Sequence, residues 1–255
     1  MQSGDRRRAV VCVVLALAAF AACAPGHGGT LGSKRHLEVA AGAQGRASTP
    51  VAAAAGPLAP GEYYTSLFEP TITYTVPEGW ELGAETEGVV FLGRDIGSER
   101  QAVSVTILSP AQAGAAVLDD PVSLPDESDE ALVHRSMPVP GDYLSYLAKH
   151  QELMVSGVQS TTLLGREGSV ADVAVTDRPG DLSCPATTSC LTLLLEQQPG
   201  VTPHGFVAGE QERVWDLGAG DDRLIVMVRV APAVADSFDR LVQDAMSVLA
   251  SVHFA

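Results

Sequence analysis

Residues 224–230 read Leu-Ile-Val-Met-Val-Arg-Val, and no other stretch says more about the fold. Successive side chains of a strand point to opposite faces of a sheet, so this run places apolar side chains on both faces. Its one polar residue is Arg229. A strand that is apolar on both sides is typical of a sheet centre covered on each face. We therefore expect residues 224–230 to form a central strand between two layers of packing.

Strand patterns continue on both sides of this run. Residues 71–76 (Thr-Ile-Thr-Tyr-Thr-Val) alternate strictly, with Ile72, Tyr74 and Val76 on one face and three threonines on the other, as in a half-buried strand. Residues 251–254 are short enough to form a closing edge strand. Similar patterns predict further strands at residues 88–93, 102–108, 158–164, 170–176, 190–196 and 213–217.

Two helices are predicted. Asp142 can cap a helix over residues 143–154, with Tyr143, Leu147, His150 and Met154 stacked on one side. A second helix spans about residues 233–250, where an apolar stripe faces a charged side and Pro232 suits the first turn. The predicted fold class is α+β: an antiparallel sheet of about seven to nine strands flanked by a mid-chain helix and a C-terminal helix.

The N-terminus has the pattern of an export signal. Arg6, Arg7 and Arg8 precede an uncharged apolar run over residues 9–22, which is shorter than the roughly 20 residues that cross a bilayer. The run ends in small residues before Cys23, which resembles a bacterial lipobox. That pattern predicts a signal peptide over residues 1–22 and a lipid, including palmitate-type acyl chains, on Cys23. The alternative is ordinary cleavage after Ala24, which would release a soluble protein. The sequence leaves Sec and twin-arginine export undecided.

A tether and a single domain are expected to follow the signal. Residues 23–60 are rich in Gly, Ala, Pro and Ser and have too few large apolar side chains to offset the entropy of ordering. We expect this segment to be the lipidated Cys and a disordered tether. The remaining residues, 61–255, have the length of one α+β domain.

The charge of the chain is strongly acidic. The sequence has 16 Lys and Arg against 31 Asp and Glu, a net charge of −15, and loss of residues 1–22 with their three Arg and one Asp makes it −17. Such a surface repels nucleic acid and anionic lipid headgroups. No nucleic-acid partner is expected, and attachment to a membrane would depend on the acyl chains.

The four cysteines have separate expected fates. Cys12 leaves with the signal peptide and Cys23 carries the lipid, which leaves Cys184 and Cys190 as one pair. In an oxidising compartment such a pair predicts a disulfide. The residues between them, Pro-Ala-Thr-Thr-Ser, supply no further metal ligand, and the spacing is not that of a redox Cys-x-x-Cys motif.

Residues 109–141 are predicted to form a long connection rich in Pro, Ala and acidic residues. Its acidic part, residues 119–130, lacks the alternating carboxylates of a calcium loop, so a solvated loop is favoured over a calcium site. The segment Gly-Ala-Gly-Asp-Asp-Arg-Leu at 218–224 matches most of one calcium-binding nonapeptide. Such repeats bind only when stacked, so we expect a Gly-rich hairpin turn.

Several blocks of the sequence resemble a widespread group of secreted actinobacterial lipoproteins of unassigned role. They are Phe68-x-Pro-x-Ile-x-Tyr-Thr-Val-Pro-x-Gly-Trp80, Asp142-Tyr-Leu-x-Tyr-Leu-x-x-His150, Thr162-x-x-x-Gly-Arg-x-Gly168, Val173-x-Val175 with the Cys pair that follows, Arg213-x-Trp-x-Leu-Gly218 and Ser247-Val-Leu-x-Ser-Val-x-Phe254. The resemblance covers about residues 62–255. It implies a PsbP-like fold and an extracytoplasmic address, and it brings no catalytic residues.

No catalytic, cofactor-binding or metal-binding residue is predicted. A Gly-x-Ser-x-Gly elbow and a His-Glu-x-x-His motif are both absent from the sequence, and no two of the four His in the folded region have helical ligand spacing. Aromatic residues on or beside strands are core residues by default. They are also the first place to seek a ligand pocket. The candidates are Trp80, Trp215 and Tyr74.

The leading functional hypothesis is a non-catalytic domain at the cell envelope, held by lipid to the outer face of the membrane. Its expected partner is an envelope protein, lipid or glycan, and no cofactor is expected. Two alternatives stay open: a hydrolase whose site is assembled from dispersed residues, and a carrier with an apolar cavity.

Overall fold

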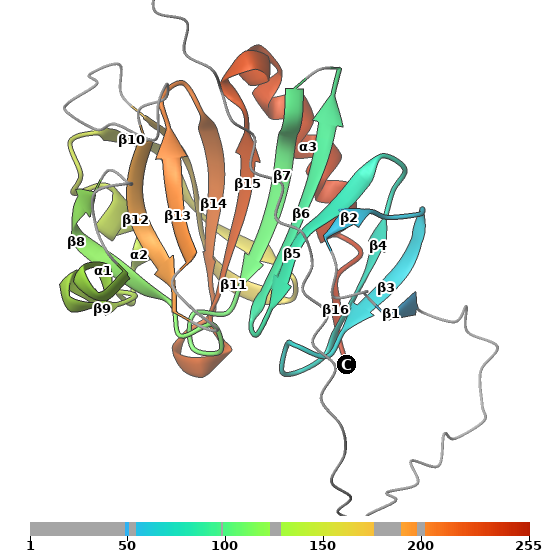
Figure 1. The fold of residues 1–255 in the computed structure, drawn as a ribbon, viewed down its shortest axis with the longest axis horizontal. Helices are drawn as coiled ribbons and strands as arrows, with labels where there is room; N and C mark the ends of the chain where they lie inside the picture. The colour runs from blue at the N-terminus through green and yellow to red at the C-terminus, as the bar shows by residue number, and fades with distance from the viewer. Residues whose placement is uncertain (1–48, 51–54, 98, 123–128, 176–189, 198–201) are drawn as a thin grey trace, which may run out of the picture. The chain divides into compact units, whose positions relative to one another are not determined.

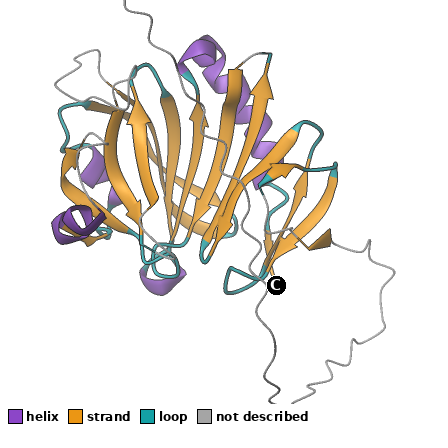
Figure 2. Ribbon diagram, viewed as in Figure 1, coloured by secondary structure: helices purple, strands orange, loops and turns teal. Residues whose placement is uncertain are grey.

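The computed structural model describes residues 49–50, 55–97, 99–122, 129–175, 190–197 and 202–255. These residues belong to one compact unit, Gly45–Ala255. Its centre is a large twisted sheet, with a long helix on one face and a smaller sheet on the other (Figures 1 and 2).

The main sheet contains eight strands within the described residues, and all of its neighbouring pairs are antiparallel. Their order across the sheet is β10-β11-β14-β15-β7-β6-β5-β2. In sequence order the strands are β2 (Gly56–Pro57), β5 (Trp80–Thr86), β6 (Val89–Ile96), β7 (Glu99–Leu108), β10 (Leu153–Leu163), β11 (Arg166–Val175), β14 (Gln211–Leu217) and β15 (Leu224–Val230).

Two smaller sheets of four strands each complete the β structure of the described residues. The first, in the order β1-β3-β4-β16, consists of β1 (Thr49–Pro50), β3 (Gly61–Thr65), β4 (Ile72–Val76) and β16 (His253–Phe254). The second, in the order β13-β12-β8-β9, consists of β8 (Ala116–Val122), β9 (Ser136–Pro138), β12 (Cys190–Glu196) and β13 (Thr202–Val207).

Helix α3 (Phe238–Leu249) and the first small sheet cover one face of the main sheet. The buried stripe of α3 consists of Leu241, Val242, Ala245, Val248 and Leu249. It shares one core cluster with the even-numbered residues of β15, with Val103, Val105 and Ile107 of β7, and with Ile72, Tyr74 and Val76 of β4. A 3-10 segment, Pro232–Ser237, leads into this helix.

The other face is covered by helix α2 (Tyr143–Leu147) and by the second small sheet, beside which lies helix α1 (Asp129–Arg135). Tyr143, Leu144, Tyr146 and Leu147 of α2 are all buried. They pack in a second core cluster with Ile225 and Met227 of β15, Val214 of β14 and Ala171 and Val173 of β11.

This arrangement confirms the predicted α+β fold, in which an antiparallel sheet lies between a mid-chain helix and a C-terminal helix. Strand β15 has the predicted bounds and the predicted central place, between β14 and β7. Leu224, Val226, Val228 and Val230 face α3, whereas Ile225 and Met227 face α2. The Gly-rich turn at residues 218–223 joins β14 to β15, as expected.

The mid-chain helix is shorter than predicted. Asp142 caps it as expected, because its Oδ1 accepts a hydrogen bond of 2.9 Å from the backbone N–H of Ser145. The helix ends at Leu147, however, and Met154 lies in strand β10. The stretch from Leu153 on is rich in Val, Ser and Thr, which favour extended structure, and Leu153 packs on the core as a strand residue.

The connection at residues 109–141, for which the sequence predicted no helix or strand, contains β8, α1 and β9. Strand β8 pairs with β12 and β9, so its formation depends on partners that are distant in sequence as well as near. Of the acidic part at residues 119–130, residues 119–122 lie in β8 and 129–130 in α1, while 123–128 lie outside the described residues, as does the Cys184 half of the expected disulfide.

Gly168 permits the close approach of β11 to β14. A Cβ at this position would lie 2.1 Å from the backbone oxygen of Asp216. We expect Gly168→Ala to lower the free energy of unfolding by about 1–3 kcal/mol, because overpacking forces the backbone to move. The matched control is Gly141→Ala, where an added Cβ meets nothing within 4 Å. Urea denaturation of both variants measures the difference; equal stabilities would contradict the expectation.

Candidate binding surface along strand β10

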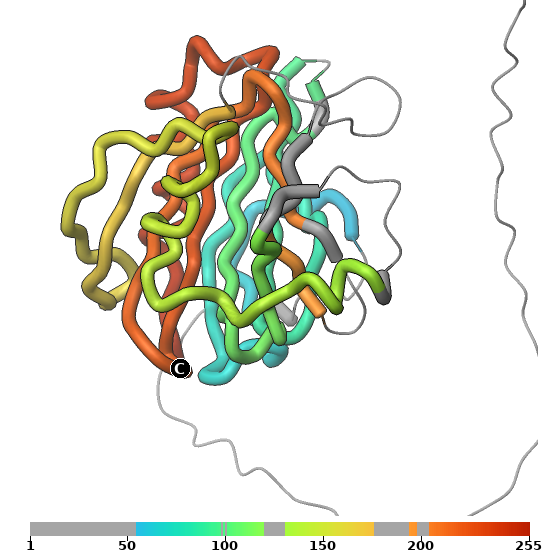
Figure 3. The backbone as a smooth tube through the Cα atoms, turned by 90° about the vertical axis from the view of Figure 1, so that its left-hand side faces the viewer, coloured from blue at the N-terminus to red at the C-terminus, as the bar shows by residue number. Residues whose placement is uncertain are grey.

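Strand β10 forms one edge of the main sheet. Within the described residues it pairs only with β11, through the hairpin that stands at the side of the molecule in yellow (Figure 3). Its eleven residues, Leu-Met-Val-Ser-Gly-Val-Gln-Ser-Thr-Thr-Leu, include no charged residue and no proline. Natural proteins usually protect such edges with charges or prolines. Strand β10 has neither.

A bulge near the middle of β10 orients its side chains. Ser156 pairs with Asp172 and Gln159 with Val170, so Gly157 and Val158 together oppose a single residue of β11. Gly157 has a φ of 66°, the left-handed conformation that glycine adopts without strain. Two apolar side chains of β10 are left exposed: Val158, of which 61% is accessible, and Met154, of which 56% is accessible.

A pocket of about 430 Å³ lies between β10 and helix α3. Trp215, Val170 and Val242 are buried at its base, and Met246 lines its helical side. Polar groups line it as well, from both the sheet and the helix: Gln159, Thr161, Asp172, Arg213 and Gln243.

The charged side chains of this pocket are paired with each other. Arg213 donates from Nε to Asp172 Oδ1 at 2.6 Å and from Nη2 to Asp172 Oδ2 at 2.9 Å. Its Nη2 also donates to Asp239 of α3 at 3.2 Å, and the guanidinium carbon lies 5.3 Å from the ring centre of Phe238. These hydrogen bonds raise the pKa of Arg213 above its ordinary value. The pairing fixes the guanidinium between the sheet and the helix.

A second, smaller pocket continues along β10 on the same face. It has a volume of about 210 Å³ and shares Asp172 with the first. Met154 and Ser156 of β10 line one side, while Phe238 of α3 lines the other. Together the two pockets accompany β10 over most of its length.

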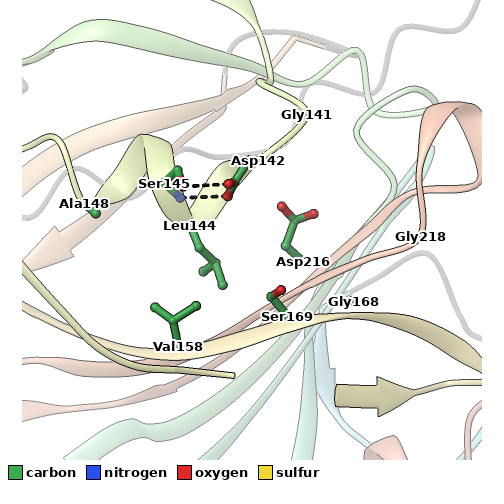
Figure 4. Close-up of a pocket in the computed structure, with 10 residues that line it drawn as sticks. All are labelled: Gly141, Asp142, Leu144, Ser145, Ala148, Val158, Gly168, Ser169, Asp216 and Gly218. Atoms are coloured by element: carbon green, nitrogen blue, oxygen red, sulfur yellow. Dashed lines mark hydrogen bonds between the residues drawn. The ribbon is translucent and has the colours of Figure 1, made fainter. Parts of the chain in front are cut away.

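A third pocket, of about 280 Å³, lies on the opposite face of β10, beside the start of helix α2 (Figure 4). Leu144 of the helix and Val158 of β10 supply its apolar side chains. Ser169 and Asp216 come from the neighbouring strands, and Asp142 and Ser145 lie next to each other at the start of the helix (Figure 4).

Asp142 is an anionic group at this third pocket. Its Oδ2 accepts a hydrogen bond of 2.6 Å from the Ser145 hydroxyl, and its Oδ1 accepts the capping bond from the Ser145 backbone. These bonds hold the pKa of Asp142 below its usual range. Since the Asp142 side chain is exposed, its negative charge faces solvent.

Asp216 anchors the wall of the third pocket through a buried ion pair. Arg223 donates from Nε to Asp216 Oδ1 at 2.7 Å and from Nη2 to Asp216 Oδ2 at 2.9 Å. Asp216 Oδ2 also accepts a bond of 2.8 Å from the backbone N–H of Tyr143, and Arg223 donates from Nη1 to the carbonyl of Pro140. This network attaches the start of α2 to the β14–β15 hairpin. Breaking such a buried pair usually costs about 3–5 kcal/mol.

Of the three aromatic residues predicted as pocket candidates, only one lines any of these three pockets. Trp80, Trp215 and Tyr74 are all buried in the core cluster between the main sheet and α3. Trp215, with 5% of its surface accessible, lines the pocket beside β10. Arg94 covers Trp80, with its guanidinium carbon 5.5 Å from the ring centre. Burial raises the pKa of the Tyr74 hydroxyl well above its ordinary value.

The histidines lie apart from the three pockets. His204 Nε2 is 3.5 Å from Glu196 Oε2, and the ring of His150 meets that of Tyr146 edge-on at 4.8 Å. His134 and His253 are exposed. Among the residues that the structure describes, no three His, Cys, Asp or Glu side chains are arranged to hold a metal ion.

A cluster of buried charges lies between the main sheet and the second small sheet. Arg229 Nε is 2.8 Å from Glu212 Oε1 and 3.2 Å from Glu210 Oε1, and its Nη2 donates to the carbonyl of Gly205 at 2.8 Å. The sequence singled out Arg229 as the polar residue of β15 but not its two partners. Strand alternation places Glu212 on the same inward face as Val214, which is the signal that was missed.

Glu210 makes the stability of this cluster depend on pH. Burial raises the pKa of Glu210 to about 7, from 4.5 in an exposed chain, although the Arg229 guanidinium opposes the shift. Between pH 4.5 and pH 7 Glu210 is deprotonated in the unfolded chain but still protonated in the folded one. The contribution of Glu210 to the free energy of unfolding is therefore fully present below pH 4.5 and is lost as the pH rises through 7. The loss is about 3 kcal/mol at most.

We expect Glu210→Gln to remove most of this loss. The free energy of unfolding is measured by urea denaturation at pH 5 and at pH 8. It should fall less between these two pH values in the variant than in the original chain. Glu87→Gln, at an exposed turn position, is the control and should behave as the original chain. Identical pH dependence in all three proteins would contradict the role assigned to Glu210.

Of the comparisons with known proteins, only the one with solved structures gives matches. No protein-family model matches the chain, and neither does any curated protein. Among solved structures, the chain is similar to LpqN of Mycobacterium tuberculosis, which is described as involved in cell envelope biogenesis. The two are 10% identical, with 79% of this chain and 91% of LpqN covered and a TM-score of 0.34.

The chain is also similar to CyanoP, the PsbP protein of Synechocystis sp. PCC 6803. The identity is 11%, the match covers 83% of this chain and 99% of CyanoP, and the TM-score is 0.36. At these values neither similarity says anything about function. The class that the structure defines is an α+β domain with pockets on both faces of an uncharged edge strand.

Proposed function

We propose that the chain is an extracytoplasmic binding domain, attached by lipid on Cys23 to the outer face of a cell membrane, that takes up a partner along strand β10. The observation that carries the binding part is the convergence of three pockets on this one edge strand. Each pocket includes side chains of β10, and they open on both of its faces.

The anchoring part is supported by the N-terminal sequence. The basic residues 6–8, the apolar residues 9–22 and the small residues before Cys23 have the order of a lipoprotein signal. Within the described part of the chain, no helix is long and apolar enough to cross a membrane. In this proposal the lipid on Cys23 supplies the attachment.

Replacing Cys23 tests the anchor. We expect Cys23→Ala to move the protein from the detergent phase of a Triton X-114 extraction into the aqueous phase or the medium, because the acyl chains are lost. Cys12→Ala is the matched control, since Cys12 lies within the predicted signal peptide. Unchanged partitioning of the Cys23 variant would refute lipidation.

Site-specific crosslinking tests the binding surface. A photo-crosslinking phenylalanine analogue at Val158 should give an adduct in the intact envelope, because this exposed side chain lies at the middle of β10. The control position is Thr75, an exposed residue of β4. The proposal fails if Val158 gives no adduct, or if the two positions give the same adducts.

A further inference from the structure

We infer that the partner of this surface is an extended polypeptide segment of another protein, which adds to the main sheet as a strand beside β10. This inference rests on the proposed function and names the partner that the same surface fits. Strand addition joins the backbone N–H and C=O groups of a sheet edge to those of a peptide, while pockets beside the edge select alternate side chains.

The edge itself favours a peptide backbone over other partners. Strand β10 spans eleven residues, extended on both sides of the bulge at Gly157, and within the described residues its outer side has no strand beside it. No lysine, acid or proline along it opposes the approach of another strand. A lipid or a sugar ring has no regular row of donors and acceptors to match this edge.

The pockets lie on both faces of β10, as pockets for the alternate side chains of an added strand would, and the bulge at Gly157 separates the two on the α3 side. Side chains of such a strand would point in turn towards α3 and towards α2, because successive residues face opposite sides of a sheet. On the α3 side, Met154 and Ser156 border one pocket and Gln159 and Thr161 the next. On the α2 side, Val158 borders the third.

The lining of these pockets defines the chemistry of the added strand. On the α3 side, Trp215, Met246, Phe238 and Met154 offer apolar surface, and the Arg213 charge is already paired. On the α2 side the exposed Asp142 carboxylate and the hydroxyl of Ser169 face the pocket. The fitting segment alternates apolar side chains with hydroxyl or basic ones.

Charge also distinguishes another protein from a second copy. Two copies of the chain from Cys23 on would each carry a net charge of −17. Such like charge opposes self-association, whereas it attracts a segment with basic side chains. A second copy is therefore the competing occupant that the experiment must detect.

The test uses a phage-displayed library of random 12-residue peptides, selected on the full chain in lipid nanodiscs. The expected result is enrichment of sequences that alternate apolar with hydroxyl or basic residues. Bound peptide should slow hydrogen exchange at β10 amides at least tenfold. Failure to enrich any sequence overturns the inference, as does a peptide that binds and leaves β10 exchange unchanged.

Two substitutions at neighbouring residues give the test its internal control. Ser160→Pro and Thr161→Pro each remove one N–H, and successive N–H groups of a strand point to opposite sides. One variant loses a bond to β11 and the other an outward donor. The variant that keeps the thermal stability of the original chain should bind the peptide at least tenfold more weakly. Unchanged binding by that variant overturns strand addition.

A charged variant tests the edge without altering the backbone. Ser160→Lys places a cation on the α2 side and should weaken the binding of a basic peptide at least fivefold, while Thr75→Lys on β4 should have no effect.

Protection of β10 amides from exchange that appears without peptide and grows with protein concentration would identify a second copy and overturn the inference. If Val158 crosslinks to a partner but no peptide is enriched from the library, the proposed binding function stands and strand addition is refuted.

Discussion

Burial on both faces of the central strands governs the arrangement of this fold. Strand β15 sends apolar side chains alternately towards α3 and towards α2 with its neighbouring sheet. Its neighbours β14 and β7 bury apolar side chains towards α3 and both apolar and polar ones on the other face. Each face therefore needs a cover, and the chain supplies two of different kinds. The covers are centred on these strands, so they give way to open pockets at β10. The candidate binding surface is thus a consequence of where the packing ends.

Buried ion pairs position α2 and the second small sheet on the main sheet, while apolar contacts supply most of the packing energy. Asp216 and Arg223 connect the β14–β15 hairpin to the start of α2, and Arg229 connects β15 to the carbonyl of Gly205 in β13. Such pairs add little net stability, because desolvation offsets their attraction. Their hydrogen bonds are directional, however, so they fix the position of α2 and of the second small sheet. The pocket beside Asp216 owes its shape to the first of these networks.

The sequence predicted the centre of the fold better than its periphery. The local pattern of residues 224–230, an apolar run with one arginine, is enough to predict a central strand. The alternation at residues 71–76 predicts β4 in the same way. The end of α2 at Leu147 was missed because Met154 continues the helical spacing by coincidence. Strand β8 was missed because its register depends on β12, which is far away in the chain. The three pockets were out of reach for a related reason: each combines residues from elements that the sequence separates, and only Trp215 among the predicted aromatics lines one of them.

An edge strand without a charge or a proline is a liability in most proteins, so its survival here needs a physical reason beyond the one bulge that it carries. The usual protection is local, in the form of a lysine or a proline on the strand itself. From Cys23 on, this chain instead carries a net charge of −17, which opposes contact between two copies. Global repulsion of this kind discourages self-pairing at β10 and leaves the same edge open to a partner that is not acidic. A lysine on β10 would repel a basic partner as well, so an acidic surface with an uncharged edge strand opposes a second copy and still admits that partner.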